Sequence, residues 1–437
     1  MDLVEVLRTR DESVARIVAR VRAAVGADVL GAEDSDLAAT VRQVIRAVAE
    51  RGDDALIEYT ARFDGVRLTP DRLRVQPAEL AAARDSLDGE LREAIELAIE
   101  NVRQFQQHIL IRDCGPLELE GVTLRSRPEP LRRVGICVPG GTAPLPSTAV
   151  MTVVPAQVAG VRQIALMAPP REGGEIHPVI LATASLLDVQ EVYRFGGAQG
   201  VAALALGTGS IEPVDKIVGP GHPSTQIAKK MLFGSRIGIE SFAGPSEVLI
   251  IADESADPAY VAADMLAQAE HDNGQAVLVT ACESLVEPVQ QQLDRLSAEL
   301  PAAESIRKGL RKNCFIILTG DWDEAVEAAN AYAPEHLHVE TREPEPPAER
   351  LRTAGAIFLG HYSPEATGDY VAGPSHVLPT GGTARFFSAL CANDFLRFTS
   401  VVRYDREALL RQSRAIVALA RAERLDAHAL SVQVRCR

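Results

Sequence analysis

Val134-Gly135-Ile136-Cys137-Val138-Pro139-Gly140-Gly141 is a short apolar run that ends in proline and glycine, and this pattern decides the fold. Such a composition is typical of a buried strand followed by a turn. Three more runs of the same kind follow, separated by stretches with helical spacing: Gln163–Met167, Glu191–Phe195 and Lys216–Val218. Alternation of this kind indicates parallel strands that are joined by crossover helices.

A second set of apolar runs begins after the region from Gly234 to Gly244. Its members are Glu247–Ala252, Ala276–Thr280, Phe315–Leu318, Leu337–Glu340 and Ala356–Leu359, again with helical segments between them. The sequence therefore predicts two open α/β sheets.

The ends of the chain have a different pattern. Helical spacing of apolar residues, with glycine and proline as punctuation, predicts four helices before the first sheet: Asp36–Ala49, Asp53–Phe63, Ala78–Leu87 and Glu90–Gln107. We expect short strands near Val122–Arg127. From Phe386 onward we expect helix again, ending in Arg406–Arg421 and a short polar tail.

Size and charge narrow the class of protein. A chain of 437 residues exceeds what one hydrophobic core normally supports, so two or more domains are expected. A net charge of -15 argues against nucleic acid as a partner. The chain has no basic-then-apolar leader and no apolar run long enough for a membrane helix, so we expect a cytoplasmic protein without a membrane partner. Its six cysteines lie far apart and without a C-x-x-C pair, which predicts reduced thiols.

Three glycine loops follow strands of the first set, where a nucleotide would lie in an open α/β sheet. They are Pro139-Gly140-Gly141-Thr142, Gly196-Gly197-Ala198-Gln199 and Gly219-Pro220-Gly221-His222. Glycine lets the backbone approach a phosphate closely, and a helix N-terminus attracts anions. None of the loops has the G-x-G-x-x-G pattern, and the acidic residue expected about twenty positions later is not evident. A dinucleotide site and ordinary strand-to-helix turns both remain open.

Polar residues that could bind a metal or move a proton cluster in four places. Gln268 and His271 lie three apart in a helical stretch and can face one ion. Glu335 and His336 follow a proline and place an acid beside an imidazole. Asp369 follows a glycine, and His428 lies in the tail. Each has an ordinary alternative, such as a solvated helix face, a helix cap or a turn aspartate. The other candidates, His108, His177, His338 and His361, are interpreted as structural or surface residues.

Taken in order, these motifs resemble those of the histidinol dehydrogenase family over nearly the whole chain. They are Val134-Gly135 through Pro139-Gly140-Gly141, Gly196-Gly197-Ala198-Gln199, Gly219-Pro220-Gly221, Ala243-Gly244-Pro245-Ser246-Glu247, Gln268-Ala269-Glu270-His271, Pro334-Glu335-His336-Leu337, Gly368-Asp369-Tyr370 and His376-Val377-Leu378-Pro379-Thr380. The resemblance implies a homodimer with one zinc ion per subunit that oxidises L-histidinol through L-histidinal to L-histidine with NAD, the last step of histidine biosynthesis.

The resemblance also implies roles for residues. Zinc would be bound by Gln268, His271, Asp369 and His428, and the acid-base pair would be Glu335 and His336. The substrate would contact Ser246, Gln268, His271, His336, Glu365, Asp369, His376, Glu423 and His428. Glu423 and His428 would come from the partner subunit. The cofactor would contact Cys137, Gln199 and His222, although a tyrosine and an asparagine are common at the first and last of these positions.

The implied architecture is two Rossmann-like open α/β domains in an intertwined homodimer. The expected parts are an N-terminal helical arm (1–32), a main domain with the zinc and catalytic residues (33–136 and 249–390), an NAD-binding domain (137–248) and a C-terminal tail (391–437) that reaches the partner's active site. Three alternatives stay open at this point: a related zinc-dependent dehydrogenase of another polar alcohol, a metal hydrolase and a catalytically silent zinc protein. Retention of Glu365, His376 and Glu423 disfavours the first.

Overall fold

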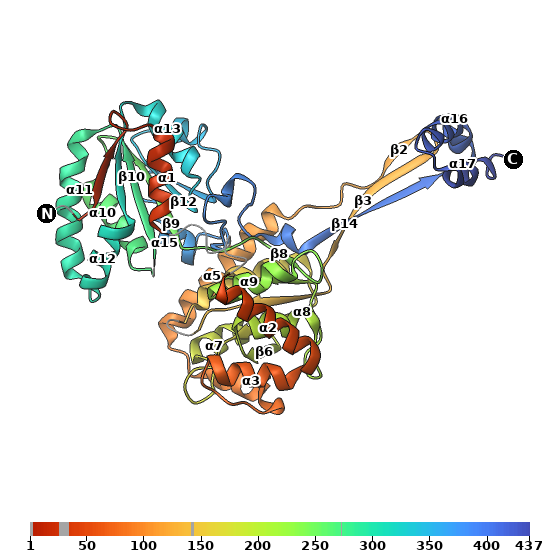
Figure 1. The fold of residues 1–437 in the computed structure, drawn as a ribbon, viewed down its shortest axis with the longest axis horizontal. Helices are drawn as coiled ribbons and strands as arrows, with labels where there is room; N and C mark the ends of the chain where they lie inside the picture. Colours follow the sequence, from red (N-terminus) through yellow and green to blue (C-terminus); the bar gives the residue numbers. More distant parts are fainter. Residues whose placement is uncertain (1–2, 26–34, 141–143, 272) are drawn as a thin grey trace.

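The computed structural model describes residues 3–25, 35–140, 144–271 and 273–437, and it has a mixed α/β fold built on two parallel sheets (Figure 1). One sheet has six strands in the order β1-β11-β10-β9-β12-β13, and the other has five in the order β6-β5-β4-β7-β8. A smaller antiparallel sheet has the order β14-β3-β2. The predicted pair of α/β sheets is therefore present.

The five-stranded sheet takes four of its strands from the first set of apolar runs, and its two-residue strand at Gly238–Ile239 was not predicted. Its strands are β4 (Arg133–Cys137), β5 (Gln163–Ala168), β6 (Glu191–Arg194), β7 (Lys216–Val218) and β8 (Gly238–Ile239). Its crossover helices are α6 (Pro146–Ala159), α7 (Pro178–Leu186), α8 (Gly197–Leu206) and α9 (Pro223–Leu232). The predicted strand positions are confirmed to within two residues, because fully buried parallel strands are near-continuous apolar runs.

The six-stranded sheet is built from the second set. Its strands are β1 (Glu5–Arg8), β9 (Glu247–Ala252), β10 (Gln275–Thr280), β11 (Phe315–Leu318), β12 (His336–Glu340) and β13 (Ala356–Leu359). The helices are α1 (Val14–Ala24), α10 (Pro258–Ala269), α11 (Glu283–Glu299), α12 (Ala303–Asn313), α13 (Trp322–Tyr332), α14 (Glu345–Ala348) and α15 (Glu365–Tyr370). The central strands β9, β10 and β12 are buried at every residue.

The four predicted N-terminal helices are confirmed as α2 (Asp36–Arg51), α3 (Asp53–Phe63), α4 (Pro77–Asp85) and α5 (Gly89–Ile109). They pack on the five-stranded sheet: residues 38–73 share a core with residues 137–239, and residues 75–102 share one with residues 134–218. The prediction that 33–136 belongs with 249–390 is corrected here, because apolar spacing shows that a helix has a buried face but not which sheet covers it. Where the domain boundaries lie remains a prediction, and the boundary at 32 falls outside the described residues.

The N-terminal arm that was predicted to be helical contains a strand as well as α1. Strand β1 pairs in parallel with β11, and Leu3, Val4 and Leu7 are buried in the cores of the six-stranded sheet. Four residues are too few to show a period in the sequence, so only pairing with a strand more than 300 positions away reveals this element.

A long arm projects from the rest of the molecule (Figure 1). It consists of the antiparallel strands β2 (Leu117–Leu119), β3 (Val122–Pro130) and β14 (Leu396–Tyr404), with α16 (Arg406–Ala422) and α17 (Asp426–Gln433) at its tip. The expectation of helix from Phe386 onward is wrong over Leu396–Tyr404. Both faces of β14 are largely exposed, so the alternation that marks a half-buried strand is missing from its sequence.

Three short 3-10 turns complete the described elements: Pro70–Arg72, Thr383–Arg385 and Ala392–Phe395. All six cysteines are free thiols, as predicted. Across the part of the chain that the structure describes, no helix combines the length and the apolar character that crossing a membrane requires.

Candidate functional site

The predicted acid-base pair, Glu335 and His336, lies at the amino end of β12, against the neighbouring strand β9. Ala333 has a left-handed backbone (φ 52°) at the end of α13, and the chain bends at Glu335 before β12 starts at His336. Glu335 Oε2 accepts the N–H of Glu247 at 2.9 Å, and His336 Nδ1 lies 3.2 Å from the Glu247 carbonyl. The two strands therefore hold both side chains in place.

Three carboxylates surround the His336 imidazole. Its Nδ1 is 3.8 Å from Glu335 Oε2 and 3.9 Å from Glu365 Oε2, and its Nε2 is 3.5 Å from Asp369 Oδ1. Glu335, His336 and Glu365 are buried, whereas Asp369 is partly exposed. His336 Nε2 and Glu365 Oε2 have no hydrogen-bond partner among the described residues, so two buried polar atoms of this group are unsatisfied.

Burial and mutual charge shift the pKa values of this group strongly. Burial raises the pKa of Glu335 to about 7 and that of Glu365 to about 8. Burial alone would lower the pKa of His336, but the charges of Glu335, Glu365 and Asp369 outweigh it and raise that pKa to about 10. Burial would raise the pKa of Asp369, but the contact with His336 outweighs burial. The pKa of Asp369 is therefore lowered. Strongly shifted groups of this kind cluster at functional sites.

The predicted metal ligands Gln268 and His271 lie at the end of α10. The prediction that they share a helix face needs correction, because α10 ends at Ala269 and His271 follows it. The turn continues through a bond from the His271 N–H to the Gln268 carbonyl at 3.3 Å. Gln268 is buried, and its Nε2 has no hydrogen-bond partner among the described residues. His271 is exposed, and its charge acts on Asp369. Asp272, beside them in the motif, lies outside the described residues.

Two further predicted substrate residues flank this group. His376 Nδ1 is 2.9 Å from the Asp369 carbonyl, and burial lowers the pKa of His376. Ser246 precedes Glu247, and its carbonyl accepts the N–H of Gln275 at 3.0 Å. Glu365 thus lies beside His336, His376 is joined to this group through Asp369, and Ser246 adjoins Glu247 along the chain.

Glu423 and His428 are not brought to this group within one chain. Both are exposed at the tip of the arm, in and beside the α16–α17 turn, and the arm points away from the six-stranded sheet (Figure 1).

A second polar cluster lies further along β12. Asp264, His338 and Glu340 are all buried, and their metal-binding atoms lie within 4.8 Å of one another. His338 Nδ1 is 2.8 Å from Asp264 Oδ2, and Glu340 Oε2 is 2.8 Å from His361 Nδ1. This cluster can also hold a metal ion. The sequence contains one signal for this cluster. Residues two apart in a strand point to the same face, and this spacing relates His336, His338 and Glu340.

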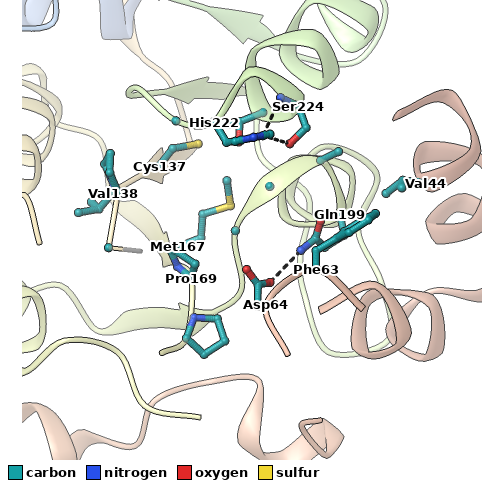
Figure 2. Close-up of a pocket in the computed structure, with 18 of the residues that line it drawn as sticks. Val44, Phe63, Asp64, Cys137, Val138, Met167, Pro169, Gln199, His222 and Ser224 are labelled. Carbon is teal, nitrogen blue, oxygen red and sulfur yellow. Dashed lines mark hydrogen bonds between the residues drawn. The ribbon is translucent and has the colours of Figure 1, made fainter. Parts of the chain in front are cut away.

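All three predicted cofactor residues line one cavity of about 940 Å³ at the carboxyl end of the five-stranded sheet (Figure 2). Cys137 ends β4, Gln199 is in the first turn of α8, and His222 precedes α9. The volume is within the range of about 300–1,000 Å³ that is usual for small-molecule sites. Burial raises the pKa of the Cys137 thiol to about 12, so this residue lines the cavity as a neutral group. Residues 141–143 of the first glycine loop lie outside the described residues.

The third glycine loop is held by a buried ion pair. Gly219 has φ +106°, and a side chain there would meet the Cys137 carbonyl at 2.3 Å, so only glycine fits. Glu240 Oε1 accepts the Gly219 N–H and the Lys229 ammonium, both at 2.7 Å, and Lys229 Nζ also donates to the Gly219 carbonyl. These bonds set the position of Pro220 and His222 at the cavity.

Two cavity residues come from a segment that sequence reasoning did not connect with the cofactor. Phe63 and Asp64, at the end of α3, face the same space as Gln199 (Figure 2). Nothing in the local sequence marks them, because Gln199 and the other loop residues of the cavity lie far away along the chain.

Comparisons with known proteins agree over nearly the full length. The model of a family described as histidinol dehydrogenase matches residues 30–436. The chain is 49% identical over 395 residues to the histidinol dehydrogenase of Rhodopirellula baltica, covering 90% of this chain and 86% of that protein. It is 46% identical over 404 residues to that of Heliobacterium mobile, covering 92% and 94%. The crystal structure of histidinol dehydrogenase from Elizabethkingia anophelis matches with a TM-score of 0.87 at 36% identity, covering 92% of each chain.

Proposed function

This chain belongs to the histidinol dehydrogenase family, which makes it an oxidoreductase of histidine biosynthesis, and we propose that it oxidises L-histidinol through L-histidinal to L-histidine. We propose further that it binds one zinc ion per subunit and uses NAD as the hydride acceptor. A related dehydrogenase of another polar alcohol is not favoured, because the family match extends over almost the whole chain.

The observation that carries this proposal is the unsatisfied polar group around His336. His336 Nε2 and Glu365 Oε2 are buried and have no hydrogen-bond partner among the described residues, and burying such atoms costs free energy unless a ligand satisfies them. A divalent cation fits here, because Asp369 contributes a charged oxygen, Gln268 an amide and His271 an imidazole. Zinc in this position would orient the imidazole and amino groups of the substrate and offset the surrounding negative charge.

The two catalytic side chains would then divide the work. His336 accepts the alcohol proton while hydride leaves the substrate carbon, which requires its neutral form. The three carboxylates favour the charged imidazole, and a cation held beside Asp369 would oppose their effect and favour the neutral form. Glu335, whose pKa is raised to about 7, is suited to take a proton from the water that adds to the aldehyde before the second hydride leaves.

We propose that the site is completed by a second subunit in a homodimer, with the partner's Glu423 at the substrate and the partner's His428 at the zinc. The arm supports this, because it leaves many large apolar side chains exposed: Phe398, Val401, Val402, Leu419, Leu425, Leu430 and Val434. Exposed apolar surface of this kind marks an interaction surface. Free thiols and a biosynthetic role are in keeping with the cytoplasm, where we place the protein.

Turnover of L-histidinol tests the proposed function. Each L-histidinol should yield two NADH and one L-histidine, with no aldehyde accumulating, because Glu335 and His336 serve both oxidations in one site. NADH absorbance and amino-acid analysis measure the ratio, and other amino alcohols serve as controls. One NADH per substrate with aldehyde released would contradict the two-step assignment, and preference for another alcohol would contradict the substrate.

A further inference from the structure

The cofactor cavity contains a carboxylate that the sheet itself does not supply. Asp64 follows α3, and its Oδ2 accepts the Gln199 Nε2 group at 3.2 Å across 135 positions of sequence. Figure 2 shows the two side chains pointing toward each other at the cavity wall, close to Phe63. The N-terminal helices therefore contribute an acid to a site whose other walls are strand-to-helix loops. They also contribute the α2 residues Leu37, Thr40, Val41 and Val44.

No cation offsets this acid within the described residues. Asp64 forms no ion pair with lysine or arginine there, and burial raises its pKa to about 6, while the bond from Gln199 works in the opposite direction. The only lysine or arginine that lines the described cavity is Arg171, which is exposed at its edge. A half-buried carboxylate that lines a cavity can accept hydrogen bonds from a ligand in addition to the one from Gln199.

The side-chain amide of Gln199 has a hydrogen-bond acceptor that no described residue satisfies. Its side chain is buried, and because a carboxylate only accepts hydrogen bonds, the amide nitrogen must face Asp64. The amide oxygen, Gln199 Oε1, is then buried without a hydrogen-bond partner among the described residues. Asp64 and Gln199 thus place two acceptors side by side, one charged and one neutral. The vicinal hydroxyl groups of a ribose offer two donors at such a spacing.

The position in the sheet indicates which ribose of a dinucleotide would lie here. Gln199 follows β6, at the edge of the sheet opposite β8. At the other side, Gln226 of α9 accepts the N–H of Ala243, in the segment that leads to β9 and the catalytic pair. Since the nicotinamide must reach that pair, the adenosine half lies at the β6 side. An exposed aromatic ring, Phe63, adjoins Asp64 there.

We propose that Asp64 and Gln199 accept hydrogen bonds from the two hydroxyl groups of the adenosine ribose of NAD, and that Asp64 thereby excludes the 2′-phosphate of NADP. The inference rests on the proposed function, in which NAD occupies this cavity. A 2′-phosphate would replace a donor with negative charge beside a carboxylate, and like charges at short range repel strongly where water is scarce. In Rossmann domains an acid that follows the glycine loop serves this purpose; here it comes from α3.

Replacement of Asp64 by asparagine tests the assignment. The substitution Asp64→Asn keeps an oxygen that accepts the Gln199 amide but removes the charge. The ratio of kcat/KM for NAD to that for NADP, measured with L-histidinol, should fall by about 10- to 100-fold, as expected for loss of a hydrogen bond to a charged group. Asp54→Asn is the matched control, since it makes the same change on an exposed residue at the other end of α3, outside the cavity. That control should leave the ratio within about twofold.

The outcomes separate this inference from the proposed function. An equal loss with both cofactors would mean that Asp64 only positions Gln199 and would overturn the inference, as would an unchanged ratio. If the unaltered protein makes no NADH from L-histidinol, the proposed function fails, and calorimetric binding of ADP-ribose and its 2′-phosphate then tests Asp64 without turnover. Preference for ADP-ribose that Asp64→Asn abolishes would still support the assignment, and equal binding of both compounds by the unaltered protein would refute it.

Discussion

At the scale of single residues, the reactivity of His336 depends on groups that lie far from it in sequence. Glu365 and Asp369 come from α15, and the Glu247 carbonyl comes from β9, yet all of them contact one imidazole. A histidine with three carboxylates around it carries a proton unless a cation intervenes. In the proposed function, a bound zinc ion would therefore favour proton transfer by His336 as well as hold the substrate.

Metal content should distinguish the two polar clusters on β12. His271→Ala should abolish zinc retention and turnover together, because it removes a ligand of the proposed site. His338→Gln should retain one zinc ion per subunit, since His338 belongs to the other cluster. Metal analysis of the purified proteins measures both. Zinc kept by His271→Ala and lost from His338→Gln would move the proposed metal site to Asp264, His338 and Glu340. Glu335→Gln is the control, with metal bound but the second oxidation slowed more than the first.

At the scale of elements, the cavity depends on a turn that one buried ion pair holds. Lys229 on α9 and Glu240 beyond β8 are both buried, and between them they bind the N–H and the carbonyl of Gly219. The backbone of this loop is thus positioned by charged side chains. A buried pair of this kind costs little when complete, but an unpaired member is strongly unfavourable.

Breaking the pair should therefore affect stability and cofactor binding together. Lys229→Met should lower the free energy of unfolding by about 3–5 kcal/mol and weaken NAD binding, because Pro220 and His222 lose their support. Denaturant unfolding and NAD titration measure the two effects. The double variant Lys229→Met with Glu240→Gln removes both charges and should recover part of the stability. A double variant less stable than Lys229→Met would show that the pair is not the cause.

At the scale of the whole molecule, the long arm has a shape that packing within a single chain does not explain. Of the described residues, none beyond 396 belongs to a hydrophobic core of the two parallel sheets, and the α16–α17 tip lies at the far end of the β-ribbon (Figure 1). Two-fold exchange of such arms would give two equivalent composite sites. The proposed active site then belongs to the dimer.

Mixing two inactive variants tests this exchange. His336→Ala and His428→Ala should each be inactive as homodimers, but in a mixed dimer one site combines an intact body with an intact arm. Random reassortment makes about half of the dimers mixed, so roughly a quarter of all sites should regain NADH production. Activity after co-refolding, with mixed dimers verified by differently tagged subunits, measures the recovery. Arms that close on their own subunit would restore none.

The local sequence is enough to identify the family and every strand of the two parallel sheets except the short strands β1 and β8. Buried strands such as β9 and β10 are continuous apolar runs, and helices such as α3 and α5 carry their own spacing and caps, so each can be recognised from its neighbours alone. Short motifs in the sequence likewise single out Glu335, His336 and Asp369. The structure places the carboxylates of Glu335 and Asp369 within 4 Å of the His336 ring.

How these parts combine depends on contacts that form only in the folded chain. The tertiary structure placed helices α2–α5 on the five-stranded sheet, paired β1 with β11, made β14 a strand, and brought Asp64 to Gln199. Each of these depends on a contact between residues far apart in the chain, where local propensity is weak and the partner surface supplies the free energy. The local sequence shows that a helix or strand has an apolar face. It does not show which other element packs against that face.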